Sequence, residues 1–109
     1  MWKRDTAGFT PLIYSILYSN NETFVSLTEA RADVNRADYN RWSPLSHAVN
    51  CSNYEITEKL INSGSILDWA GYDGLTPLMI AYINRDSKII DQLEKSGARI
   101  RAEQNLIIK

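Results

Sequence analysis

The sequence has little of what small proteins use for covalent or metal-based stabilisation. Its 109 residues include one cysteine, Cys51, and one histidine, His47. A single thiol cannot form an intrachain disulfide, and one thiol with one imidazole cannot supply the four ligands of a structural zinc site. We therefore expect no disulfide and no metal. A reducing compartment fits this composition best, the cytoplasm with the nucleus as the alternative.

The sequence also lacks a long hydrophobic run and an excess of charge of one sign. No apolar stretch approaches the roughly 20 residues that cross a bilayer, and no apolar signal segment follows Met1. Twelve Lys and Arg residues oppose thirteen Asp and Glu residues, which leaves a net charge of −1. Neither nucleic acid nor a membrane is therefore an expected partner. The hydrophobic fraction of 44% nevertheless predicts a folded domain.

The common motifs of catalysis and nucleotide binding are absent as well. The sequence contains no G-x-x-x-x-G-K-[ST], G-x-G-x-x-G or H-E-x-x-H pattern. A nucleophile with a histidine base would have to use His47, which we interpret as a helix-surface or packing histidine. We interpret Cys51, near the end of the same segment, as a small filler rather than a nucleophile. Neither enzymatic activity nor a cofactor is expected.

What the sequence does contain is an internal repeat. The phrases Thr10-Pro11-Leu12, Ser43-Pro44-Leu45 and Thr76-Pro77-Leu78 lie 33 residues apart and include all three prolines. A hydroxyl side chain before proline is typical of a helix start, because the hydroxyl caps a free N–H and proline tolerates the first helical position. Each of these segments is followed by a polar break and a second apolar-periodic segment, which in the last two copies stops at Gly64 and Gly97. The repeated unit is therefore predicted to be a helical hairpin.

Hairpins this short cannot bury an apolar face alone, so the three copies are expected to stack around a continuous core. The predicted helices are 11–18, 21–30, 44–51, 54–63, 77–84 and 87–96. The residues predicted to be buried are Leu12, Leu27, Leu45, Ala48, Leu60, Leu78, Ala81 and Leu93. The polar residues expected to close the stack on its outer side are Arg85, Lys88, Asp91, Gln92, Lys95 and Arg99.

The repeat length, the phrase from Asp5 to Leu12 and the phrase Ala32-Asp33-Val34-Asn35 resemble the ankyrin repeat, a β-turn finger followed by two antiparallel helices. The resemblance implies an all-α ankyrin-repeat solenoid of stacked helix-turn-helix units with β-turn fingers. Residues 1–109 are predicted to form a single ankyrin-repeat domain, with repeats at about 5–36, 37–69 and 70–102. The tail at 103–109 is expected either to pack as a last finger or to mark the truncation of a longer array.

The fingers depart from the family pattern at several positions. The histidine usual after Thr-Pro-Leu is replaced by Ile13, Ser46 and Met79. Of these, only Ser46 could substitute as a hydrogen-bonding group. Arg41 and Arg31 stand where glycines are usual, and a left-handed backbone at either arginine would cost roughly 1–2 kcal/mol. Gly71 stands where the second finger has Asp38.

The resemblance further implies that the protein binds a partner protein through the concave surface formed by the fingers and the first helices. The partner-binding candidates are Phe9, Tyr18, Tyr39, Asn40, Trp42, Trp69, Tyr72, Asp73 and Leu75. Most are aromatic, and aromatic anchors are favoured at interface hot spots. The alternative for Phe9, Trp42 and Leu75 is packing between neighbouring fingers. A monomer is expected, and the competing interpretation is a structural or self-association module that oligomerises through its under-capped terminal repeats.

The resemblance also implies a candidate modification site. The segment from Leu27 to Asn35 resembles the ankyrin sequences that an animal asparaginyl hydroxylase modifies, with Asn35 as the acceptor. The other interpretation of Asn35 is an amide that stabilises the finger.

Overall fold

A computed structural model describes residues 6–100 as six α-helices. Each helix begins at the predicted residue and ends one residue before the predicted end. The difference arises because the predicted last residue is in each case the C-cap, whose N–H still bonds to the preceding turn. The helices are α1 (Pro11–Leu17), α2 (Asn21–Glu29), α3 (Pro44–Asn50), α4 (Tyr54–Asn62), α5 (Pro77–Ile83) and α6 (Ser87–Lys95).

The helix starts are fixed by side-chain caps of two kinds. The first helix of each hairpin has a hydroxyl cap followed by proline, and the caps are Thr10, Ser43 and Thr76. The second helix of each hairpin has an amide or carboxylate cap, and these caps are Asn20, Asn53 and Asp86. In all six the cap oxygen accepts a hydrogen bond from the backbone N–H three residues later, which satisfies a donor that the helix itself leaves free.

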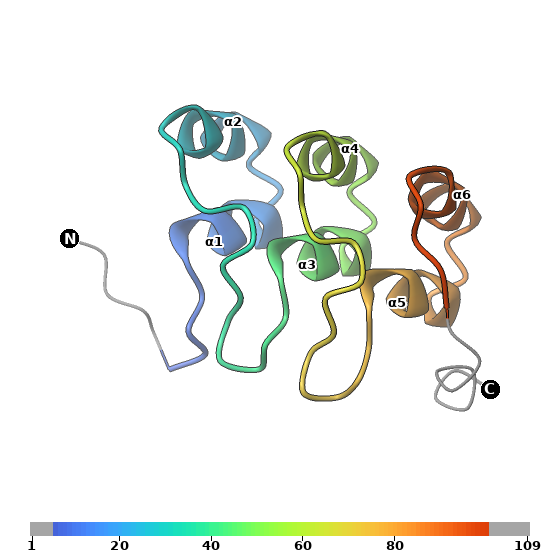
Figure 1. Ribbon diagram of the computed structural model, residues 1–109. Helices are drawn as coiled ribbons and strands as arrows, with labels where there is room; N and C mark the ends of the chain where they lie inside the picture. The colour runs from blue at the N-terminus through green and yellow to red at the C-terminus, as the bar shows by residue number, and fades with distance from the viewer. Residues whose placement is uncertain (1–5, 101–109) are drawn as a thin grey trace.

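The hairpins stack side by side in an elongated array of 42 × 27 × 20 Å (Figure 1). α1, α3 and α5 form one row and α2, α4 and α6 form a second row, while the loops that join the hairpins extend from the first row as fingers (Figure 1). α3 packs against both α1 and α5, so the middle repeat is covered on two sides. The described segments fold as an all-α solenoid of helical hairpins, and this confirms the predicted fold class.

The core runs through all three hairpins. Seven of the eight residues predicted to be buried are at most 2% exposed. Leu27 is the exception, because it is only half-buried. Its equivalents Leu60 and Leu93 are fully buried, since each has a preceding repeat packed over it among the described residues. The prediction that Leu27 is buried was therefore wrong, because no preceding repeat covers this position among the described residues.

One side chain assigned to the polar outer face lies inside the array. Gln92 is buried, and its Nε2 donates to the backbone oxygen of Tyr54 at 3.2 Å and to Glu58 Oε1 at 2.9 Å. The amide thus ties α6 to α4, whereas the other five outer-face residues are exposed as predicted.

The fingers contain strained backbone and no strand within residues 6–100. Arg31 (φ 67°) and Arg41 (φ 64°) both adopt the left-handed conformation that was anticipated from the missing glycines. Neighbouring fingers are joined by single backbone hydrogen bonds, from Tyr39 N–H to Ala7 O at 3.0 Å and from Tyr72 N–H to Asn40 O at 3.1 Å. The tail at 103–109, for which two arrangements were expected, lies outside the described residues.

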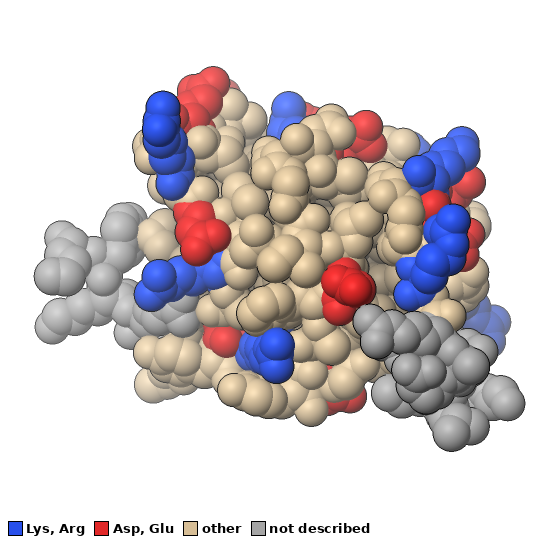
Figure 2. Space-filling model, viewed as in Figure 1, with Lys and Arg blue, Asp and Glu red and all other residues tan. Residues whose placement is uncertain are grey.

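Charged side chains of both signs are scattered over the face seen in Figure 2, and neither sign forms a continuous patch among the coloured residues. This distribution agrees with the net charge of −1. Within residues 6–100, none of the helices has the length and apolarity to cross a membrane.

Candidate binding groove

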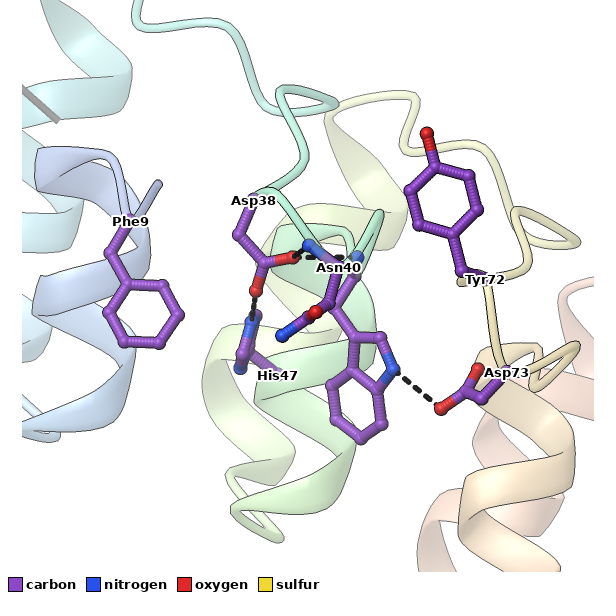
Figure 3. A pocket seen from close by; sticks show the side chains of 7 residues that line it. Phe9, Asp38, Asn40, His47, Tyr72 and Asp73 are labelled. Atoms are coloured by element: carbon purple, nitrogen blue, oxygen red, sulfur yellow. Dashed lines mark hydrogen bonds and ion pairs between the residues drawn. The ribbon is translucent and has the colours of Figure 1, made fainter. Parts of the chain in front are cut away.

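The fingers and the adjoining helices enclose a groove of about 380 Å³, which we call the finger groove (Figure 3). It is lined by Phe9, Asp38, Asn40, Trp42, His47, Tyr72 and Asp73. These residues come from all three fingers and from α3. A volume of this size falls within the range of about 300–1,000 Å³ that is typical of ligand pockets.

Asp38 organises the middle finger. Its Oδ1 accepts hydrogen bonds from the backbone N–H groups of Asn40 and Trp42, both at 2.9 Å. Its Oδ2 lies 2.8 Å from His47 Nε2 on α3, and both side chains are almost completely buried. The finger is thus fastened to the helix beneath it by one carboxylate (Figure 3).

The Asp38–His47 pair braces the finger, a role for which Ser46 was the candidate among the residues after Thr/Ser-Pro-Leu. The Ser46 hydroxyl is hydrogen-bonded, but it accepts a bond of 3.2 Å from the helix-capping hydroxyl of Ser43 and stays within its own helix turn. His47 packs as interpreted, but it is also a hydrogen-bonding element of the groove wall. One sequence signal could have indicated this pair. His47 lies one position after the histidine that is usual in the family, and Asp38 lies nine residues before it.

Trp42 links the second finger to the third. Its indole Nε1–H donates to Asp73 Oδ2 at 2.9 Å, while Asp73 Oδ1 accepts from the backbone N–H of Leu75 at 3.0 Å. The indole also lies against Gly71, where an added Cβ would come within 2.6 Å of Trp42 Cδ1. This close approach explains why the third finger has glycine where the second has Asp38. Trp42 therefore packs between fingers and lines the groove at the same time.

Phe9 and Tyr72 stand on the two sides of the groove (Figure 3). Phe9 is half-buried and meets the His47 ring edge to face, with ring centroids 5.6 Å apart. Tyr72 is 79% exposed. The His47 ring is also 5.3 Å from the Trp42 ring, so the imidazole is held between two aromatic walls.

The structure brings five of the nine predicted partner-binding residues to this groove, namely Phe9, Asn40, Trp42, Tyr72 and Asp73. The other four lie elsewhere. Tyr39 is exposed over Gly8, where an added Cβ would meet its ring at 2.5 Å. Trp69 donates its indole N–H to the Arg41 carbonyl at 2.8 Å, and the Arg41 guanidinium lies 4.5 Å from its ring centroid.

The remaining two candidates occupy different surroundings. Leu75 is half-buried and packs against the core, in line with the packing interpretation. Tyr18 is 76% exposed at the end of α1 and lines a second groove of about 290 Å³ on the first hairpin. We call this second cavity the end groove, and its lining residues are Pro11, Tyr14, Ser15, Tyr18, Asn20, Thr23 and Leu27.

Asn35 connects two consecutive loops. Its Oδ1 accepts a hydrogen bond from the backbone N–H of Ile66 at 2.9 Å, and its own N–H donates to Asp33 Oδ1 at 2.9 Å. These bonds show the amide in a structural position. They leave the modification of Asn35 as a separate hypothesis.

The thiol is placed differently from its prediction. Cys51 is exposed at the C-cap of α3, so its interpretation as a small filler was wrong. Partial burial of the sulfur raises the pKa of the Cys51 thiol, which lowers the thiolate fraction at neutral pH and with it the nucleophilicity. Among residues 6–100, no three His, Cys, Asp or Glu side chains gather in a way that could hold a metal ion.

Three helical hairpins that stack on a common core and share a surface between their fingers define a helical-repeat solenoid. Residues 25–104 match the family of ankyrin repeats in three copies, and the chain belongs to the ankyrin-repeat family. Ankyrin repeats are non-enzymatic modules that generally mediate protein–protein interactions.

Several curated proteins contain similar segments. The chain is 32% identical to chicken (Gallus gallus) inversin over 96 residues, which is 88% of this chain and 9% of inversin. It is 32% identical to human neurogenic locus notch homolog protein 1 over 103 residues, 94% of this chain and 4% of that protein. It is 40% identical to human palmitoyltransferase ZDHHC13 over 62 residues, 57% of this chain and 10% of that protein. The chain thus spans at most a tenth of the length of these relatives.

Proposed function

We propose that this protein binds a partner protein through the finger groove. The observation that carries the proposal is the convergence of Trp42, Tyr72 and Asp73 from two neighbouring fingers on one cavity. Aromatic side chains bury large rigid surfaces at low entropic cost, and fixed polar groups beside them supply orientation. A cavity built across repeats suits a protein segment that runs along the array.

The rigidity of the groove supports this role. Trp42 is held by Asp73 and Gly71, and Asp38 holds the finger that carries Trp42. A pre-organised surface loses less conformational entropy on binding, so more of the contact energy appears as affinity. In this proposal the protein is a non-catalytic monomeric module that acts in the cytoplasm and takes neither nucleic acid nor membrane as its partner.

The test compares two tyrosines of nearly equal exposure. A partner captured with the wild-type protein is purified, and its dissociation constant is measured by calorimetry for Tyr72→Ala and for Tyr18→Ala. We expect Tyr72→Ala to weaken binding at least about tenfold, which corresponds to about 1.4 kcal/mol, because tyrosine is enriched among the side chains that carry most of the binding energy of an interface. Tyr18→Ala removes a similar area outside the finger groove and should leave the affinity unchanged. Loss of affinity in Tyr18→Ala alone would contradict the proposal.

Trp42→Ala gives a stronger effect and needs a folding control. Trp42 is the central ring of the groove, and its truncation should weaken partner binding at least about thirtyfold, which corresponds to about 2 kcal/mol. Because Trp42 also packs between fingers, the helical circular dichroism and the cooperative unfolding of the variant are measured in parallel. A folded variant with full affinity would exclude the finger groove as the binding surface.

A second candidate function is self-association, which the end groove favours. Leu27, half-buried here, occupies a position that is fully buried in the next two repeats, and Tyr18 lies beside it on the same surface. A second copy of the chain could cover this surface. Light scattering over a concentration series decides the matter. A mass that rises with concentration in the wild type but not in Tyr18→Ala supports self-association, and a constant monomer mass contradicts it.

A further inference from the structure

We propose that the finger groove receives an arginine side chain of the partner, an inference that rests on the proposed function and specifies its chemistry. The guanidinium would lie against the Trp42 ring and pair with the Asp73 carboxylate, which accepts the hydrogen bond of the Trp42 indole (Figure 3). The argument depends on three properties of the groove: its charge, its aromatic rings and the hydrogen bonds that its carboxylates already make.

The charge of the groove is negative. Two carboxylates line it, and none of the seven described residues around it is lysine or arginine. Within residues 6–100 the ion pairs are His47–Asp38 and Lys95–Asp91, so Asp73 has no cationic partner there. Asp38 is thus paired within the groove, whereas the Asp73 carboxylate has no counter-charge among residues 6–100 and attracts a cationic group.

The two carboxylates differ in what they can still accept. Asp38 accepts two backbone N–H groups and pairs with His47, and it is almost completely buried. Asp73 is exposed and makes one hydrogen bond with each oxygen, to Leu75 N–H and to the Trp42 indole. An ionised carboxylate has about four lone-pair positions, so Asp73 keeps one free on each oxygen. Two free positions on one carboxylate match the parallel donors of a guanidinium.

The aromatic rings favour a cation over an apolar side chain. Cations lie over indole and phenol faces because of the ring quadrupole. Residues 6–100 already contain two such contacts, Arg41 over Trp69 at 4.5 Å and Lys88 over Tyr54 at 4.2 Å. Trp42 lies beside the Asp73 carboxylate, and no cation among residues 6–100 lies over its ring. Arginine is preferred to lysine because its planar group can stack on a ring and form hydrogen bonds in its own plane together.

The probe is a blocked tripeptide, acetyl-Gly-Arg-Gly-amide, compared with the same peptide containing citrulline. Citrulline keeps the shape of arginine but has no charge. Binding is followed by the ¹H–¹⁵N signal of the Trp42 indole, whose N–H is donated to Asp73, as peptide is added to millimolar concentrations. We expect a saturable shift with the arginine peptide and a dissociation constant at least about fivefold higher for the citrulline peptide. Equal shifts with both peptides, or no shift with either, would overturn the proposal.

Asp73→Asn is the matched variant, with Asp33→Asn as its control. Both aspartates are exposed and accept the N–H two residues later, but Asp33 lies outside the groove. Asp73→Asn should weaken the binding of the arginine peptide at least about fivefold. Asp33→Asn should leave the affinity for this peptide within about twofold of the wild-type value. Equal effects of the two variants would refute a role for Asp73.

The partner itself separates this inference from the proposed function. If Tyr72→Ala weakens the binding of the partner while Asp73→Asn and added salt do not, the finger groove binds the partner and the arginine assignment is wrong. If Tyr72→Ala and Asp73→Asn both leave the partner's affinity unchanged, the proposed function itself is wrong and the arginine inference falls with it. If both variants weaken the binding of the partner and added salt also weakens its binding to the wild-type protein, both proposals are supported.

Discussion

Replacing Asp38 by alanine should destabilise the protein more than any other single change in the fingers. The substitution leaves three donors without their acceptor: the N–H groups of Asn40 and Trp42, and the imidazole of His47. A hydrogen bond to a charged group contributes about 1.5–3 kcal/mol. Water can replace the carboxylate at the exposed Asn40 N–H, but not readily at His47, which is 8% exposed. We therefore expect a loss of about 3–5 kcal/mol in the free energy of unfolding.

Urea unfolding followed by tryptophan fluorescence measures this loss. With a urea dependence of about 1–3 kcal/mol per M, the midpoint should fall by at least about 1 M. Asp33→Ala is the matched control. Asp33 is an exposed aspartate that accepts one backbone N–H, so we expect a cost of about 1 kcal/mol or less.

A double-mutant cycle tests whether His47 is the partner responsible. His47→Ala and Asp38→Ala should be non-additive by about 1–3 kcal/mol, because each single change already breaks their shared bond. A cost below about 1 kcal/mol for Asp38→Ala, or strict additivity in the cycle, would refute the view that this pair fastens the middle finger to α3.

Two further predictions concern the core and the loops. Leu60→Ala should cost about 2–5 kcal/mol in urea unfolding, since its cavity lies between two neighbouring repeats, whereas Leu27→Ala at the equivalent half-buried position should cost clearly less; equal costs would mean that stacking does not determine burial. Asn35→Ala should cost about 1 kcal/mol because the Ile66 N–H loses its acceptor. Intact-mass analysis after incubation with an asparaginyl hydroxylase tests modification of Asn35, and an unchanged mass would eliminate that hypothesis.

The helices could be predicted from the sequence because their determinants are local. A hydroxyl, a proline and an apolar period recur every 33 residues, and each acts within one or two turns of its own position. The hydroxyl and proline predict the starts of the three first helices, and the polar breaks with their Asn and Asp caps predict the starts of the three second helices. The predicted ends differ from the observed ends only by the C-cap residue.

The groove could be predicted only in part, since its contacts join distant residues. Trp42 bonds to Asp73, which lies 31 residues away, and Asp38 bonds to His47, which lies nine residues away. Composition identified the aromatic residues as candidates, but not which of them share a cavity. Gln92 shows the same limit: its polarity predicted exposure, whereas its burial depends on acceptors from α4.

The contact of Trp42 with Gly71 makes the three repeats non-interchangeable. Gly71 occupies the position of Asp38 in the repeat before it. If a duplicate of the middle repeat were stacked on the original, Trp42 would meet a second Asp38 in place of glycine.

Tyr39 would meet a second Arg41 instead of Gly8, because these two positions are also 33 residues apart. Repeat proteins are prone to misfold by pairing the wrong neighbours. Here a stack that places one middle repeat directly on another meets both steric collisions at the fingertips. The fingers therefore disfavour this wrong pairing as well as forming the groove.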